Sequence, residues 1–189
     1  MRLFVAVYPP PEAVHDIVAQ VHRLRIGAAA RSGVNVRLTA PSTLHVTVAF
    51  LGEVPDERLP VVEEALSRVE TSGGLRAPRL RFGGGGRFGR GRFTVLWVGL
   101  RGEVDVLRRL GATVRRELRR ARIPFDVRPL RPHLTLARPG ERIDPGSLDE
   151  DLSTLDGYLG PSWPATELVL VRSQLGPRPT YDRLASWPL

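Results

Sequence analysis

Residues 44–51 read LHVTVAFL, and residues 132–138 read PHLTLAR. Both stretches are short, largely apolar and bounded by glycine or proline, which is typical of β-strands. Each contains a His-x-Thr tripeptide with an aliphatic residue at x, a second aliphatic residue after the threonine, and then an alanine. Two of the four histidines in the chain therefore share one motif in one local context. This repetition suggests a fold with two similar halves.

Strand geometry gives both motifs a direction, because successive side chains point to opposite faces of a strand. We expect each strand to have one apolar face that packs into a core and one face that carries the histidine and the threonine. In the first strand, the apolar face holds Val46, Val48 and Phe50. The opposite face holds His45, Thr47 and Ala49. In the second strand, the apolar face holds Leu134 and Leu136, and the opposite face holds His133, Thr135 and Ala137. Packing about a pseudo-two-fold axis would bring both histidines to one cleft.

The remaining sequence predicts an α+β protein. Apolar residues recur at spacings of three and four in amphipathic helices expected within 11–24, 59–69 and 107–118. Further strands are expected at 3–8, 35–38, 79–82, 94–100, 168–171 and 180–184, with a loop or short helix near 144–152. No linker is long enough to separate independent domains. We therefore expect residues 1–189 to form one domain of two intertwined lobes, each contributing one His-x-Thr strand.

Composition limits the function classes. The chain of 189 residues has no cysteine, which excludes a disulfide scaffold, thiolate metal sites and thiol catalysis. The apolar run at residues 3–7 is too short for a signal peptide or a membrane span, so we expect a cytoplasmic protein without membrane contact. The net charge is +8, and all 28 basic residues are arginine. This excess points to a polyanionic partner such as nucleic acid or another phosphate-bearing ligand, and a solvated basic surface with no specific partner is an equally good interpretation of the charge alone.

Paired histidines and threonines suit the opening of a cyclic phosphodiester. The reaction needs a base that deprotonates water and an acid that protonates the departing sugar oxygen. Imidazole titrates near neutrality, so one neutral and one protonated ring can coexist. Threonine hydroxyls can donate hydrogen bonds to phosphate oxygens as negative charge builds there. No cluster of Asp, Glu or His flanks either motif, so we expect neither a metal nor another cofactor.

Several blocks together carry a family resemblance: RLFVAV, LHVTVAFLGEV, TVLWVGL, RPHLTLAR and the ending VLVRSQLGPRPTYDRL. They resemble the bacterial LigT-like RNA 2′,3′-cyclic phosphodiesterases of the 2H phosphoesterase superfamily, over nearly the whole chain. The resemblance implies a bilobal fold with two antiparallel sheets flanking a central cleft and helices on the outside. It also implies hydrolysis of RNA 2′,3′-cyclic phosphate ends to 2′-phosphates, and reversible 2′-5′ RNA ligation.

The resemblance also implies roles for the motif residues. His45 would be the proton donor and His133 the proton acceptor, whereas Thr47 and Thr135 would bind the phosphate. The near symmetry of the motifs does not by itself assign the two proton-transfer roles. Similar proteins usually have a tryptophan shortly before the first motif, where this chain has Leu38. This difference concerns substrate preference rather than the hydrolytic centre.

Further candidates for substrate binding lie outside the motifs. The segment GGGGRFGRGRF at 83–93 resembles arginine- and glycine-rich RNA-binding sequences, although a flexible connection between strands is the simpler interpretation of its glycines. Phe88 is its candidate stacking residue, and Phe93 is expected to begin the next buried strand. The remaining candidates are Arg131, Arg138 and Tyr181. Arg138 faces away from His133 by strict alternation, unless the strand end bulges.

Some alternatives remain open. The arginines at 115, 116, 119, 120 and 122 are interpreted as a solvated helix face, which would extend an RNA footprint only if it borders the cleft. The same chemistry could act on small cyclic nucleotides or on an ADP-ribose cyclic phosphate. A non-catalytic module that binds RNA ends is a third hypothesis, but binding alone would be served equally well by arginine or lysine. The sequence contains no oligomerisation signal, so we expect a monomer.

Overall fold

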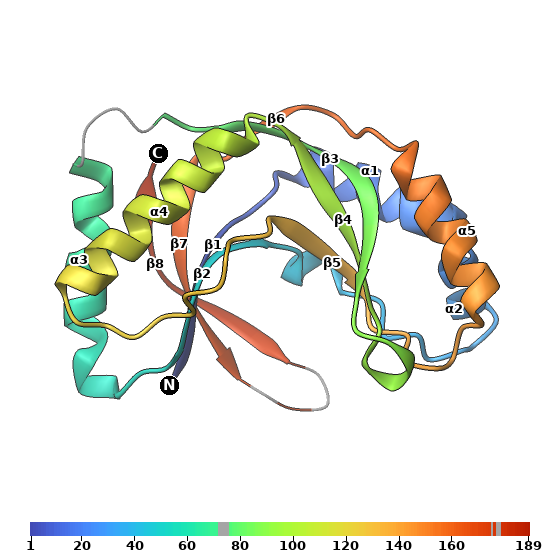
Figure 1. Cartoon of the computed structure of the whole chain (residues 1–189), viewed down its shortest axis with the longest axis horizontal. Helices are drawn as coiled ribbons and strands as arrows, with labels where there is room; N and C mark the ends of the chain where they lie inside the picture. The colour runs from blue at the N-terminus through green and yellow to red at the C-terminus, as the bar shows by residue number, and fades with distance from the viewer. Residues whose placement is uncertain (72–75, 175, 177–178) are drawn as a thin grey trace.

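The computed structural model describes residues 1–71, 76–174, 176 and 179–189 (Figure 1). Within these residues, the strands form one antiparallel sheet in the order β6-β3-β4-β5-β2-β1-β7-β8. The strands are β1 (Arg2–Val7), β2 (Val46–Glu53), β3 (Arg79–Phe88), β4 (Val95–Gly102), β5 (His133–Ala137), β6 (Trp163–Pro164), β7 (Glu167–Gln174) and β8 (Thr180–Pro188).

Helices pack on one face of this sheet. They are α1 (Pro11–Arg23), α2 (Arg25–Arg31), α3 (Leu59–Thr71), α4 (Val104–Arg120) and α5 (Pro145–Asp156). Helices α3 and α4 contact strands β8 and β2, whereas α1 and α5 contact β3 and α2 packs on α1 and α5. The helices therefore form two groups, one at each end of the sheet (Figure 1). The α+β class with antiparallel strands, predicted from the sequence, is confirmed.

The two His-x-Thr strands meet at the centre of the sheet. Strands β2 and β5 are paired at one position only, Val46 opposite Leu134. This pair joins a half made of β2, β1, β7 and β8 to a half made of β6, β3, β4 and β5. The two expected sheets are thus continuous through a single contact, because the strands diverge on either side of it. Each half contributes one His-x-Thr strand.

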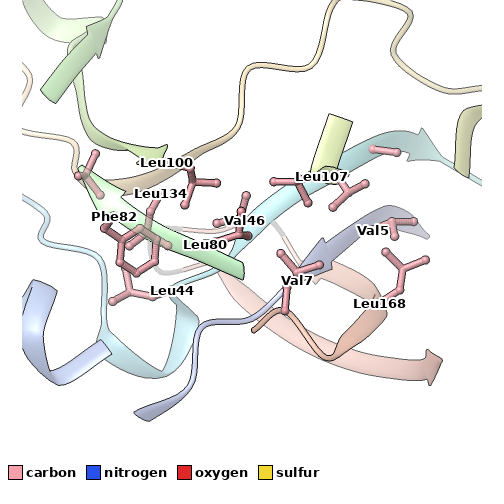
Figure 2. Close-up of a cluster of buried hydrophobic side chains, with 14 of the residues drawn as sticks. Val5, Val7, Leu44, Val46, Leu80, Phe82, Leu100, Leu107, Leu134 and Leu168 are labelled. Atoms are coloured by element: carbon pink, nitrogen blue, oxygen red, sulfur yellow. The ribbon is translucent and has the colours of Figure 1, made fainter. Parts of the chain in front are cut away.

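One hydrophobic core runs through both halves. Val5 and Val46 come from one half, and Phe82 and Leu134 from the other, and all four are completely buried. Figure 2 shows these side chains as members of one cluster of buried hydrophobic residues. At about 25 cal/mol per Å² of apolar surface removed from water, this shared burial stabilises the junction between the halves. The core therefore fixes where the two histidine strands lie relative to each other.

A β-bulge in β2 changes the alternation expected from the sequence. The register with β1 runs from Thr47 directly to Ala49, which leaves Val48 as an extra residue. A bulge of this kind places two consecutive side chains on the same side of the strand. Val48 and Ala49 both join the main core, whereas Phe50 packs with Phe4 in a separate cluster on the opposite face of the sheet. The expected positions of Ala49 and Phe50 were therefore wrong.

Strand β5 has a bulge at the equivalent position. Its register with β4 runs from Thr135 directly to Ala137 and skips Leu136. Leu136 and Ala137 are both buried in the main core, so Ala137 does not share the face of His133 as strict alternation predicted. The next residue, Arg138, turns to the face of the sheet that carries both histidines, which we call the histidine face. The two halves thus repeat a bulge as well as a motif.

The glycine run belongs to a strand and is not a flexible connection. Strand β3 continues through Gly83–Gly86 to Phe88 and pairs with β4 at residues 80–82 and 85–88, with a register shift at Gly83 and Gly84. A Cβ atom on Gly86 would lie 2.0 Å from the Trp97 ring, and one on Gly85 would lie 2.8 Å from the Leu155 Cβ in α5. These glycines therefore allow a helix and an aromatic ring to approach the strand closely.

Three other elements differ from the sequence expectations in kind or extent, or were not expected. Residues 35–38 form no strand, although Leu38 makes an isolated bridge to Ala137. The element near 144–152 is the full helix α5, which begins where the Asp144 side chain accepts a hydrogen bond from the Ser147 backbone N–H. The short edge strand β6 was missed, because two residues are too few to show periodicity.

Candidate active site

A cleft of about 1660 Å³ opens on the histidine face of the sheet. His45, Thr47, His133 and Thr135 all line it. Their convergence follows from the pairing of Val46 with Leu134, because each histidine immediately precedes one of these residues. The two motifs therefore meet at the same point of the sheet, and all four side chains reach one cleft.

The two imidazoles are held in the same way. The Nδ1 atom of His45 lies 2.7 Å from the Thr43 carbonyl oxygen, and the Nδ1 atom of His133 lies 2.7 Å from the Arg131 carbonyl oxygen. A carbonyl oxygen can only accept, so Nδ1 carries the hydrogen in both rings. The Nε2 atom of each ring is therefore the one left to exchange protons. A neutral ring presents a base at Nε2, and a protonated ring presents an acid.

Burial lowers the pKa of both histidines below the ordinary value of 6.5. For His45, the backbone hydrogen bond to Thr43 opposes this shift, and the charge of His133 adds to it. For His133, the bond to Arg131 opposes the shift, and the charge of Arg138 adds to it. Both rings are thus mainly neutral at pH 7 in the free protein. The mutual effect also means that protonation of one imidazole disfavours protonation of the other.

Aromatic rings enclose His45. The Phe4 ring stacks on the imidazole at a centroid distance of 4.7 Å, and the Tyr181 ring meets it edge to face at 5.1 Å. Tyr8 lies 6.0 Å away at a tilt. Phe4 comes from β1 and Tyr181 from β8, so two strands of this half shape the surroundings of one histidine. These rings exclude water, which accounts for the effect of burial on the His45 pKa.

His133 has a similar environment in the other half. The Phe88 ring meets it edge to face at 4.8 Å, and Trp97 lies 5.9 Å away. Phe88 and Trp97 also contact each other at 5.2 Å. Phe88 thus contacts His133 edge to face, in the same way that Tyr181 contacts His45. The structure brings both sequence-predicted aromatic residues next to the predicted catalytic pair.

Arginine side chains line the rest of the cleft, together with a single carboxylate among the described residues, that of Asp126. The arginines are Arg2, Arg37, Arg115, Arg128, Arg131 and Arg138. Arg138 is on the histidine face because of the β5 bulge, as the charge that it exerts on His133 also indicates. Both predicted arginines, Arg131 and Arg138, are therefore in the cleft. The surplus of positive charge suits a phosphate-bearing ligand.

Not every sequence expectation agrees with the site. Phe93 does not begin a buried strand, because it lies in a short 3₁₀ turn before β4 and is 68% exposed. Arg115 borders the cleft, whereas Arg116, Arg119, Arg120 and Arg122 lie outside it, as a solvated face requires. His15 and His22 are exposed on α1. Among the described residues, no group of three or more His, Asp or Glu side chains could hold a metal ion.

Sequence reasoning missed Phe4, Trp97 and Phe50. Phe4 lies in the first strand two residues before Ala6, and its face depends on register with β2, which the sequence does not show. Trp97 is opposite Thr135 across the β4–β5 pair. Its place in a long apolar run suggested only a buried strand. Phe50 was assigned to the wrong face because the bulge was not anticipated.

Comparisons with known proteins agree on one family. The model of the family described as 2'-5' RNA ligase superfamily matches residues 9–177. A Thermus thermophilus protein named RNA 2',3'-cyclic phosphodiesterase is 31% identical over 200 residues, covering 100% of this chain and 90% of its own. An Escherichia coli K12 protein of the same name is 34% identical over 139 residues, covering 72% and 71%.

Solved structures give the same result. The crystal structure of the Thermus thermophilus protein TT0787 has a TM-score of 0.72 at 32% identity, covering 100% of this chain and 98% of that one. Escherichia coli LigT complexed with 3'-AMP has a TM-score of 0.70 at 27% identity, covering 100% and 97%. The likeness therefore extends over the whole fold, including both histidine strands.

Proposed function

The chain belongs to the 2'-5' RNA ligase superfamily, and from this membership we propose that it hydrolyses 2′,3′-cyclic phosphate ends of RNA to 2′-phosphates. The family resemblance inferred from the His-x-Thr blocks is confirmed by the family match and by relatives named RNA 2',3'-cyclic phosphodiesterase. The observation that carries the proposal is the matched pair of imidazoles, each with Nδ1 bonded to a backbone carbonyl and both lining one cleft.

The reaction divides into two proton transfers. Nε2 of neutral His133 takes a proton from water, and the water oxygen forms a bond to phosphorus. The bond from phosphorus to the ribose 3′ oxygen breaks, and that oxygen takes the proton of Nε2 of protonated His45. The phosphate remains on the 2′ oxygen. We assign the two roles by motif position in the family, because the geometry of the two imidazoles is nearly the same.

The substrate itself supports the required protonation states. Both imidazoles have a lowered pKa in the free protein, so an acid must gain its proton when substrate binds. A cyclic phosphodiester carries one negative charge, which raises the pKa of a neighbouring imidazole. Because each protonated ring disfavours the other, one proton is shared between the two sites. The bound state then holds one acid and one base.

The side chains around the histidines have matching roles in this proposal. The Thr47 and Thr135 hydroxyls donate to the non-bridging phosphate oxygens as charge builds on them. Arg138 adds a positive charge beside His133, and Arg131 binds the RNA backbone near the same imidazole. Phe88 and Tyr181 flank the two rings and offer faces against which a base or ribose can pack.

The same centre accounts for ligation. If the 5′ hydroxyl of a second RNA replaces water as the nucleophile, the same phosphorus–oxygen bond breaks and a 2′-5′ phosphodiester forms. No nucleotide cofactor is needed, because the energy comes from the strained cyclic phosphate. We propose this reaction as a second activity of the same residues, with His133 as the base and His45 as the acid.

The setting of the enzyme is also part of the proposal. None of the helices in the described part of the chain is long and apolar enough to cross a membrane. We propose a monomer that acts in the cytoplasm, where reducing conditions suit a chain that has no cysteines. Residues 1–189 form one domain of two intertwined lobes in this proposal, since the chain leaves the half of β1 and β2, builds the other half with β3 to β6, and returns for β7 and β8.

An assay on a defined RNA end tests the proposed function. An oligoribonucleotide ending in a 2′,3′-cyclic phosphate is incubated with the protein and a chelator, and the products are separated. We expect a 2′-phosphate end, with turnover about 10²- to 10⁴-fold lower in His45→Ala and His133→Ala. His22→Ala, a change on the exposed face of α1, serves as the matched control. Full activity in either of the first two variants, or a requirement for metal, would contradict the mechanism.

A further inference from the structure

The cleft continues past His45 along the histidine face of β1 and β2. The Phe4 ring, which stacks on His45, also packs against the Phe50 ring at 5.7 Å. The Arg2 guanidinium lies over the other end of this row, 5.4 Å from the Phe50 centroid. Arg2, Phe4 and Phe50 all line the cleft. A row of aromatic faces thus leads from the reacting centre to an arginine.

Two arginines at this end of the cleft have unused hydrogen-bonding capacity. The Nε atoms of Arg2 and Arg115 are buried and have no hydrogen-bond partner in the described part of the chain. Leaving a buried charged donor unpaired is costly, so such a donor is expected to meet an acceptor in the working state. Both side chains face the cleft, and neither has an ion pair among the described residues. Arg115 donates from Nη1 to the Arg128 carbonyl oxygen at 3.4 Å, and both guanidinium groups keep further capacity to bind an anionic ligand.

Asp126 lies near Arg115 and is hydrogen-bonded to β2. Its backbone N–H donates to the Phe50 carbonyl at 2.7 Å, and its carboxylate is paired with Arg128. The charge of Arg115 also reaches Asp126, whose pKa is lowered to about 2, chiefly by the hydrogen bonds from Arg128. The one carboxylate here is thus already occupied by Arg128, and it leaves the charges of Arg115 and Arg2 uncompensated. The cluster therefore keeps a net positive charge beside the Phe50 ring.

We infer that Arg2, Arg115 and Phe50 form a second subsite, which binds the RNA strand upstream of the cyclic phosphate. The guanidinium groups of Arg2 and Arg115 pair with an upstream phosphate, and a base packs against the part of the half-buried Phe50 ring that faces the cleft. Single-stranded RNA combines these two features, whereas an isolated cyclic mononucleotide has neither an upstream phosphate nor a second base. The inference rests on the proposed function and specifies an RNA chain as its substrate.

The size of the cleft supports an extended ligand. A volume of about 1660 Å³ exceeds the roughly 300–1,000 Å³ that typically holds a small molecule. The bulge in β2 is what opens the upstream part, because strict alternation would have put Phe50 in the core and left Arg2 without its neighbour. The subsite and the catalytic histidine are thus positioned by the same two strands.

A comparison of two substrates tests the inference. The value of kcat/KM is measured for a short oligoribonucleotide with a 2′,3′-cyclic phosphate end and for adenosine 2′,3′-cyclic phosphate. We expect Arg2→Gln, Arg115→Gln and Phe50→Leu each to lower the ratio of the first value to the second, by roughly tenfold for each arginine. The salt dependence of the oligonucleotide reaction should also weaken by about 0.7 in log–log slope for each lost phosphate contact.

The control and the outcomes separate the two proposals. Arg109→Gln removes the same charge from an exposed position on α4 outside the cleft, and it should leave the ratio unchanged. If both substrates are hydrolysed and the ratio is the same in all three subsite variants, the subsite is wrong and the proposed function stands. If the wild-type protein hydrolyses neither substrate, the proposed function is wrong.

If the wild-type protein hydrolyses neither substrate, a binding measurement still tests the subsite. Fluorescence anisotropy with an oligoribonucleotide that ends in a 2′-phosphate reports affinity without turnover. Roughly tenfold weaker binding by Arg2→Gln or Arg115→Gln than by Arg109→Gln supports the subsite. Equal affinity of all three variants overturns it. Phe50→Leu, which keeps an apolar side chain, replaces the arginine variants if either of them fails to fold.

Discussion

At the scale of single residues, two backbone carbonyls define the chemistry. The Thr43 and Arg131 carbonyls fix the same tautomer in both imidazoles and leave Nε2 to the cleft. The ring environments then differ only in detail, with Phe4 and Tyr181 on one side and Phe88 on the other. A ligand that breaks the symmetry of such a pair decides which ring acts as the acid and which as the base. A bound phosphodiester does so, because its leaving oxygen faces one ring and its attacking water faces the other.

The lowered pKa values predict an acidic optimum. The active free enzyme has one protonated and one neutral imidazole, and this form is most abundant between the two pKa values. Burial lowers both pKa values below 6.5. We therefore expect a bell-shaped dependence of kcat/KM with its maximum below pH 6.5, falling as the pH rises because the acid loses its proton. A maximum above about pH 7, measured on the oligonucleotide substrate, would be inconsistent with this account.

The threonines act on the transition state rather than on folding. Thr47 and Thr135 are half-buried beside the histidines, and both line the cleft. We expect Thr47→Val and Thr135→Val to lower kcat by roughly 10²- to 10³-fold, as the loss of one oxyanion donor does elsewhere. Thr154→Val on α5, away from the cleft, is the matched control. Wild-type kcat in either cleft variant would exclude a role in charge stabilisation.

At the scale of elements, the repeated bulge is what the sequence did not reveal. Alternation correctly predicted that His45 and Thr47 share one face, because the bulge lies beyond them at Val48. It failed for Phe50, since a bulge depends on pairing with β1, a strand far away in sequence. Alternation likewise predicted the face of His133 correctly and the face of Ala137 wrongly. Local periodicity therefore predicts a strand, whereas its register and irregularities come from tertiary partners.

The glycine strand gives a prediction about stability. Alanine at Gly86 would place a Cβ atom 2.0 Å from the Trp97 ring, so the ring must move. We expect Gly86→Ala to lower the free energy of unfolding by about 1–3 kcal/mol, as overpacking usually does. Gly157→Ala is the control, since its Cβ would meet only the Thr154 carbonyl oxygen at 3.8 Å. Chemical denaturation checks both variants, and equal stabilities would mean that the close contact is unimportant.

At the scale of the whole molecule, the two halves form one cleft because one pair of residues joins them. Val46 and Leu134 hold the histidine strands together, and the shared core fixes the rest of the junction. The sequence motifs predicted this convergence through their symmetry. They could not predict that the sheet is continuous, because that depends on a single pairing across the chain. The enzyme class followed from short motifs, whereas the upstream subsite depends on tertiary structure.

The charge of the cleft predicts a strong effect of salt. Six arginines line it among the described residues, and some of them neutralise RNA phosphates in our account. We expect log kcat/KM for the oligonucleotide to fall linearly with log salt concentration, with a slope of about −0.7 for each phosphate contact on a single strand. Adenosine 2′,3′-cyclic phosphate should show a shallower slope. Equal slopes for the two substrates would indicate that the upstream RNA makes no ionic contact.

The central claim is that His45 and His133 share one phosphate. Titration of the imidazole NMR signals with and without inorganic phosphate tests it most directly, with His45→Ala and His133→Ala used to assign the signals. Our account predicts that both rings of the free protein titrate below 6.5, and that phosphate raises the pKa of at least one of them while shifting the signals of both. If either ring titrates above 6.5 in the free protein, or if phosphate leaves one ring unaffected, the shared site is contradicted.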